Sequence, residues 1–190
     1  MRHLTFEIYD EKTLEIAVQN MEGERLAHDS FLVCHLFCGG RGSATCLKII
    51  RQIKDRIKEK VVIAGIASNA EFLDGRVTDP IPVLSVLSFD EAEAELLYEC
   101  DIRDLEQKIG SEFVEKINSM GNVRAVELLV CNTGSGILDF LHEFETCDRK
   151  IPVFGGMPFG HDLLHDPRYI VTSDDITENP LTCTVDIAMV

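Results

Sequence analysis

The sequence predicts an α/β protein in which a mixed sheet, or more than one, is flanked by helices. Continuous apolar runs at 31–37 and 61–66 are typical of buried strands, and the segment between them repeats apolar side chains at helical spacing. A similar order of strand, glycine turn, helix and strand returns between residues 125 and 154. Helices that alternate with strands in this way cover the faces of a sheet.

The first half is expected to contain one helix, two strands around a second helix, and then two further strands. The ranges are a helix over 11–21, a strand over 31–37, a turn over 38–42, a helix from Ser43, and strands over 61–66, 83–89 and 93–100. Ser43 is expected to cap its helix, which presents Cys46, Ile49, Ile50, Ile53 and Ile57 on one side. The last two strands flank an acidic turn, so we expect an antiparallel hairpin.

The second half is expected to repeat this order. Its elements are a helix over 104–119, a strand over 125–131, a turn over 132–136, a helix over 137–147, and strands at 152–154, 169–172 and 182–189. The separation between Cys38 and Cys131 in the sequence is nearly the same as the separation between Gly65 and Gly156. We therefore expect one domain over 1–190, built from two pseudo-repeats of an αβαβββ unit at 1–101 and 102–190.

The arrangement of the layers is left open by the sequence, because a layered α-β-β-α sandwich fits the same order of elements as one continuous mixed sheet. The chain ends within an apolar strand-like segment, Ala188 to Val190. This ending is typical of a domain that forms part of a longer polypeptide.

The composition limits the kinds of partner that the protein is expected to bind. A formal charge of -15 repels the phosphates of nucleic acid and anionic membrane surfaces, so neither is an expected partner. The N-terminus lacks the apolar segment and cleavage site of a signal peptide, and no apolar stretch is long enough to span a bilayer. We therefore expect a cytoplasmic protein.

The seven cysteines are expected to be reduced and mostly buried, because they are odd in number and form no CxxC pair. A zinc site needs closely spaced thiolate or imidazole ligands, which these cysteines do not supply. His161 and His165 are four residues apart, but Gly160 and Pro167 leave barely one helical turn around them. We expect no metal and no cofactor.

Four glycine-bearing turns follow predicted strands, where α/β sheets often bind ligands through exposed backbone amides. Their residues are the candidate ligand-binding set: Gly39, Gly40, Arg41, Ser43, Gly65, Ser68, Asn69, Glu71, Asn132, Thr133, Ser135, Gly155, Gly156, His161 and Asp162. Neither a Walker loop nor a GxGxxG pattern is present. Arg41 beside the first turn is suited to clamp a carboxylate, so the expected partner is a small polar metabolite.

Two other classes of function stay open. An acyl- or amide-transfer enzyme would use Cys38, Cys131 or Ser68 as nucleophile, with His35 or His161 as base. The sequence lacks a GxSxG elbow, which favours a protein without catalytic residues. The third class is a protein-interaction module that contacts its partner through the acidic surface or a sheet edge.

The order of motifs resembles the N-terminal region of FIST domains, a family of sensory modules. The first motif, residues 65–71, reads GIASNAE and matches the family's GxSTxGE-like turn at Gly65 and Glu71, with Ser68 in place of threonine. The second, residues 155–162, reads GGMPFGHD and matches a GGxAGD-like turn when extra residues are allowed. Ala67 and the pair Asn69-Ala70 depart from the family pattern. The resemblance implies a signal-transduction module that senses a small ligand such as an amino acid and acts on a signalling output domain or subunit.

Overall fold

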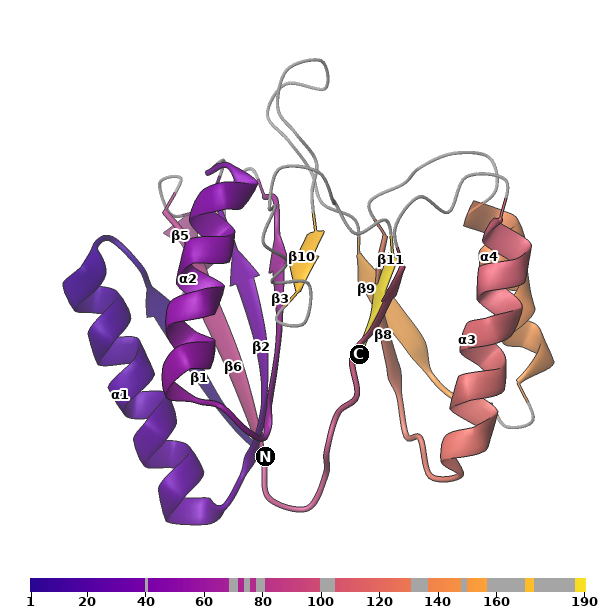
Figure 1. Cartoon of the computed structure of the whole chain (residues 1–190), viewed down its shortest axis with the longest axis horizontal. Coiled ribbons are helices and arrows are strands. Elements are labelled where there is room, and N and C mark those ends of the chain that lie inside the picture. Colours follow the sequence, from indigo (N-terminus) through magenta and orange to yellow (C-terminus); the bar gives the residue numbers. More distant parts are fainter. Residues whose placement is uncertain are drawn as a thin grey trace. The chain divides into compact units, whose positions relative to one another are not determined.

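A computed structural model of the chain describes residues 1–39, 41–68, 72–73, 76–77, 81–99, 105–130, 137–147, 150–156, 170–172 and 187–190. The fold is α/β, as the sequence predicts, with helices flanking mostly antiparallel mixed sheets (Figure 1). The chain forms two compact units. Unit 1 contains Met1–Glu95 and Pro158–Cys183, and unit 2 contains Leu96–Met157 and Thr184–Val190.

Unit 1 has a five-stranded sheet in the order β1-β6-β2-β3-β10. Its strands are β1 (Arg2–Glu7), β2 (Phe31–Phe37), β3 (Val61–Ile66), β6 (Val83–Phe89) and β10 (Ile170–Thr172). Only β2 and β3 run parallel, and the other neighbours are antiparallel. A small antiparallel pair, β4 (Phe72–Leu73) and β5 (Arg76–Val77), lies outside this sheet.

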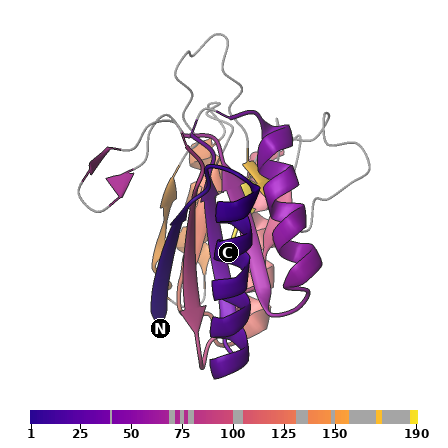
Figure 2. The same ribbon diagram turned by 90° about the vertical axis from the view of Figure 1, so that its left-hand side faces the viewer.

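Helices α1 (Glu11–His28) and α2 (Ser43–Arg56) lie side by side against the sheet of unit 1 (Figures 1 and 2). Helix α1 begins with a capping box, in which Asp10 accepts from the Thr13 amide at 2.8 Å and Thr13 accepts from the Asp10 amide at 3.0 Å. The predicted apolar side of α2 is confirmed, because Cys46, Ile49, Ile50, Ile53 and Ile57 are all buried. These residues join the core formed by alternate residues of β2, β3 and β6.

Unit 2 has a four-stranded sheet in the order β7-β11-β8-β9. Its elements are β7 (Leu97–Glu99), α3 (Glu106–Met120), β8 (Val126–Val130), α4 (Ile137–Glu143), a 3-10 turn at Phe144–Thr146, β9 (Val153–Gly156) and β11 (Ile187–Met189). The core is centred on Phe140, which is fully buried and packs edge-on against Phe113 at 5.8 Å between ring centroids. Ile109, Phe113 and Ile117 supply the facing stripe of α3.

The two sheets share one topology. In unit 1, β1, β6, β2 and β3 are neighbours in that order with antiparallel, antiparallel and parallel pairing. In unit 2, β7, β11, β8 and β9 follow the same order with the same directions. Each unit also places a helix after its first strand and another after its second. The shared order is what a duplication would produce, while the pseudo-repeat boundaries stay a prediction.

Two expectations about the order and pairing of the strands are wrong. The expected hairpin of 83–89 and 93–100 does not form, because β6 pairs with β1 and β2 whereas β7 pairs with β11 in the other unit. The repeated unit also begins with a strand, since Arg2–Glu7 pairs with β6 as β1. Local pairing was expected at 83–100, but the insertion of β6 between β1 and β2 satisfies both edges of β6 within unit 1.

The edge of the unit 1 sheet contains a polar cluster around Arg2. Arg2 forms ion pairs with Glu24 of α1 and with Asp90, which follows β6, and it donates to the buried hydroxyl of Ser30 at 2.9 Å. The bonds from Arg2 hold the pKa of Glu24 below its usual value of 4.5 and lower the pKa of Asp90 from 3.8 to about 2. The first strand and the first helix are thus tied to the end of β6.

We expect unit 1 to lose stability as the pH falls from about 5 to about 2. Both carboxyls have a folded pKa below the unfolded one, so their contribution is present above the unfolded value and is lost on protonation. Arg2→Gln should make this pH dependence shallower, as measured by urea unfolding at several pH values. Arg124→Gln, at an exposed arginine of unit 2, is the control. An unchanged profile in Arg2→Gln would contradict the assignment.

Candidate ligand-binding site

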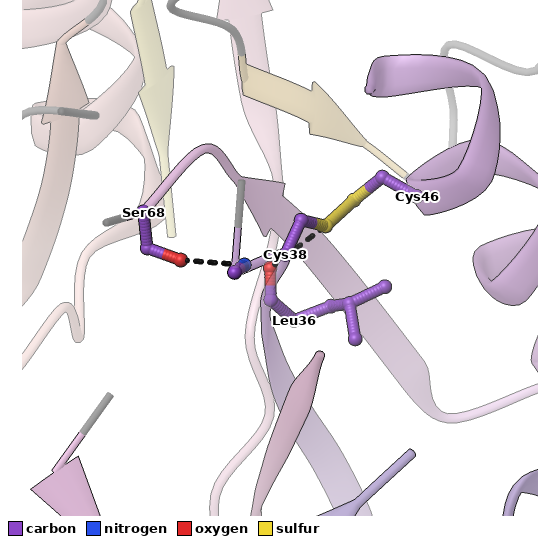
Figure 3. Close-up of a disulfide and its surroundings, with 5 residues drawn as sticks. Leu36, Cys38, Cys46 and Ser68 are labelled. Carbon is purple, nitrogen blue, oxygen red and sulfur yellow. Dashed lines mark hydrogen bonds between the residues drawn. A yellow bond between two sulfur atoms is a disulfide. The ribbon is translucent and has the colours of Figure 1, made fainter. Parts of the chain in front are cut away.

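The ends of the parallel strands β2 and β3 bring two of the predicted glycine turns together. The Cys38 amide donates to the Ile66 carbonyl at 3.0 Å. The Gly39 amide donates to the Ser68 hydroxyl oxygen at 2.9 Å, and a dashed line at Ser68 marks this bond in Figure 3. The Arg41 amide closes the first turn by donating to the Cys38 carbonyl at 2.9 Å. Gly39, Arg41 and Ser68 therefore lie at the same edge of the sheet, as carboxyl ends of parallel strands should.

Cys38 and Cys46 form a disulfide that joins this turn to the first turn of α2 (Figure 3). This corrects the expectation that the cysteines are all reduced, and it leaves Cys38 without the thiolate that a nucleophile requires while the bond is intact. Cys34 is a free and fully buried thiol, and burial raises its pKa. Cys147 is half-buried in unit 2, and Cys100, Cys131 and Cys183 lie outside the described residues.

A surface hollow of about 200 Å³ lies in unit 1 beside Arg41, and we call it the Arg41 hollow. It is formed by the segment that follows β1, by one side of α2 and by the residue before β6. Its lining residues are Ile8, Tyr9, Asp10, Glu11, Leu14, Arg41, Thr45, Lys48, Ile49, Gln52 and Pro82. The volume is below the roughly 300–1,000 Å³ of pockets for drug-sized ligands, so the hollow suits a small metabolite.

The Arg41 hollow combines both signs of charge with apolar walls. Arg41 and Lys48 contribute positive charge, and Asp10 and Glu11 contribute negative charge. Lys48 and Glu11 form an ion pair at 3.3 Å with both side chains largely exposed, so this contact is weak and can be exchanged for a ligand. The apolar walls come from residues that are otherwise buried, such as Ile8, Leu14 and Ile49.

Asp10 is held as an anion at the entrance to α1. The hydrogen bond from the Thr13 amide, together with the one from the Thr13 hydroxyl, keeps the pKa of Asp10 below its ordinary value of 3.8. On the other side, α2 begins at Ser43 with Gly42 as its N-cap, and no side chain caps it. Ser43 is therefore not the cap that the sequence predicts; it is the first helical residue, at the positive end of the helix dipole.

Several of the predicted site residues lie apart from the Arg41 hollow or outside the described residues. Gly65 is buried within β3, where it faces Cys46, and Gly155 and Gly156 belong to β9 of unit 2. Residues Gly40, Asn69, Glu71, Asn132, Thr133, Ser135, His161 and Asp162 fall outside the described residues. Whether all four turns contribute to one site stays a prediction.

Sequence reasoning missed the half of the hollow that comes from α1 and its preceding turn. Tyr9, Asp10 and Glu11 follow β1, and this strand was not recognised. A usable signal was present on α2, because Thr45, Lys48, Ile49 and Gln52 recur at the spacing of one helical face that begins after Arg41. That face carries a charge and an amide where the buried face of α2 carries only apolar groups.

The described part of the chain offers neither a metal site nor a membrane-spanning helix. No group of three or more His, Cys, Asp or Glu side chains there is arranged to hold a metal ion. Among the described helices, none combines the length and apolar character that a membrane crossing requires.

Comparison of the chain with family models, curated proteins and solved structures finds no match. Its functional class therefore has to be argued from the residues and the geometry of the site.

Proposed function

We propose that this chain is a small-ligand-sensing domain that binds a zwitterionic metabolite of about amino-acid size in the Arg41 hollow. The observation that supports this most is the composition of the hollow, where two cations and two anions line one cavity with apolar walls. Small-molecule sites typically combine apolar walls with a few placed polar groups. A ligand that carries both charges can satisfy both sets of side chains.

Each charged group has a role in this proposal. Arg41 and Lys48 bind the ligand's carboxylate, with the start of α2 adding the positive end of its dipole. Asp10 and Glu11 bind the ammonium group. Ile8, Leu14 and Ile49 contact the apolar part of the ligand, which sets its size.

The resemblance to FIST domains supports a sensory role, in which the domain acts in the cytoplasm and passes its ligand state to an output domain or subunit. Such coupling needs a ligand that binds one conformation more tightly than another. A ligand can favour one conformation if it contacts elements that can move relative to each other. The Arg41 hollow is bounded by two separate elements, α1 and α2, which are joined by ion pairs. Arg56 pairs with Glu22 at 2.7 Å, and Lys48 pairs with Glu11.

A thermal-shift screen tests ligand binding. The probes are the common L-amino acids, with acetate and methylamine as ligands that carry a single charge. At least one amino acid should raise the melting temperature in a concentration-dependent way, because a ligand that binds only the folded state stabilises it. Acetate and methylamine should each give a much smaller shift. A flat screen would contradict the proposal and favour an interaction module that binds a protein partner.

Two substitutions test whether the binding occurs in the Arg41 hollow. Arg41→Ala should weaken binding of the amino acid found in the screen about tenfold or more, because it removes a charge-assisted hydrogen bond. Asp10→Asn should also weaken binding while α1 stays capped, since asparagine is as good an N-cap as aspartate. Lys58→Ala, at an exposed residue beyond the far end of α2, is the matched control. Equal affinity in wild type and in both hollow variants would place the ligand elsewhere.

A further inference from the structure

The Cys38–Cys46 disulfide joins two segments that each contribute a residue to the lining of the Arg41 hollow. Cys38 follows the last residue of β2, and Cys46 is in the first turn of α2. Arg41 is bonded through its amide to the Cys38 carbonyl, and Thr45 is the residue before Cys46. Both Arg41 and Thr45 line the hollow. The bond therefore fixes the backbone that positions two of its lining side chains.

The two sulfur atoms are enclosed by tightly packed neighbours. Cys38 and Cys46 are both 0% exposed. Gly65 on β3 leaves room for the Cys46 sulfur, because a Cβ built at Gly65 would lie only 2.3 Å from it and 2.8 Å from Val171. Two separate thiols occupy more space than two bonded sulfurs, and the side chains around Gly65 are already closely packed on the Cys46 side. Cleavage of the bond must therefore displace the turn or the start of α2.

We propose that Cys38–Cys46 is a reversible thiol–disulfide switch that holds the wall of the Arg41 hollow in its ligand-binding form when oxidised and releases it when reduced. The co-reactant is a small thiol such as glutathione. One thiolate attacks a protein sulfur, which breaks the disulfide and forms a mixed disulfide. A second thiolate attacks that mixed disulfide, so a small-molecule disulfide leaves and both cysteines take up protons from water. Two electrons pass from the two small thiols to the protein disulfide.

The bond is placed where local opening can expose it. Cys38 lies beyond the strand ladder of β2, which ends at Phe37, and exposed residues Arg41 and Gly42 follow it. Cys34, by contrast, lies inside the ladder between β3 and β6 and is fully buried. A thiol inside the ladder becomes accessible only when the sheet opens, whereas a turn beyond the ladder can open by itself. Cys34 therefore provides an internal reference for opening of the sheet.

The kinetic test compares these two positions in the full chain. The protein is incubated with dithiothreitol, alkylated at intervals with an excess of iodoacetamide and digested, and each cysteine is followed by mass spectrometry. We expect Cys38 and Cys46 to become alkylated at least tenfold faster than Cys34. Equal rates at all three positions would overturn the proposal, because they would mean that the bond opens only when the sheet of unit 1 opens.

The conformational test uses hydrogen exchange without any ligand. Reduced protein should exchange faster than oxidised protein at the amides of residues 39–47, and Cys38→Ser/Cys46→Ser should match the reduced form under both conditions. Exchange at 31–36 should stay the same, since these residues lie within β2. Identical exchange at 39–47 in the two redox forms would overturn the switch.

The effect on binding rests on the proposed function, and its failure can be told apart from failure of the switch. Calorimetric titration with the amino acid found in the screen should show affinity at least tenfold weaker in reduced protein. Equal affinity in the two redox forms would overturn the claim that the disulfide controls ligand binding in the Arg41 hollow. If no amino acid binds, the exchange difference at 39–47 still decides whether the disulfide switches the turn.

Discussion

Gly155→Ala is expected to destabilise unit 2 by about 3 kcal/mol or more. Gly155 has a φ of 142°, which an L side chain rarely adopts, and a Cβ there would lie 1.8 Å from the Leu128 carbonyl oxygen. The obstacle is backbone of the neighbouring strand β8, so no rotamer change can relieve it. Chemical unfolding followed by circular dichroism, with hydrogen exchange at 126–130, measures the loss.

The adjacent glycine provides a matched control. A Cβ at Gly156 would have no atom of the described residues within 4 Å, so Gly156→Ala should leave unit 2 as stable as the wild type or slightly more stable. Equal destabilisation by the two substitutions would show that the register of β9 on β8 is wrong. The two variants also distinguish a structural role from a ligand-binding role. Close backbone packing explains the glycine at position 155, whereas packing does not require one at position 156.

Gly65→Ala is expected to destabilise unit 1 by about 2–3 kcal/mol. The added methyl would overlap the Cys46 sulfur and the Val171 side chain, and the disulfide prevents the sulfur from turning away. Gly23→Ala lies on an exposed part of α1, where the new Cβ would have no atom of the described part of the chain within 4 Å, and it should instead raise helix stability slightly. Urea unfolding of both variants under oxidising conditions makes the comparison.

A double-mutant cycle identifies the cause of this effect. In a Cys38→Ala/Cys46→Ala background, the sulfur that Gly65→Ala would overlap is absent, so we expect the cost to fall to about 1 kcal/mol, with the Val171 overlap remaining. The same loss in both backgrounds would mean that the disulfide is not what Gly65 accommodates. The cycle thus tests the packing that underlies the proposed switch.

The fold of unit 1 was predictable wherever the hydrophobic pattern was strong. Strands 31–37, 61–66 and 83–89 have the predicted bounds because buried central strands are apolar almost throughout. The strand at Arg2–Glu7 was missed because it is an edge strand whose residues are mostly half-buried, so its sequence mixes charged and apolar side chains. The pairing of β6 with β1 could then not be predicted either, since it joins segments that are far apart in the sequence.

The candidate site was predictable only in part. Arg41 was identified from its glycine turn, and Gly39 and Ser68 do meet at the edge of the sheet. Asp10 and Glu11 were not identified, because their place in the hollow depends on the missed strand β1. The disulfide carried no spacing signal either, since the eight-residue separation of Cys38 and Cys46 becomes a contact only when α2 folds back over β3.

Hydrogen exchange of the oxidised protein, with and without the amino acid that binds most tightly in the screen, tests the proposed site most directly. The ligand should slow exchange at residues 8–14 and 41–52, because these segments form the Arg41 hollow. Arg41→Ala should abolish the slowing at the same ligand concentration. Slowed exchange confined to unit 2, or no slowing in either segment, would contradict the account.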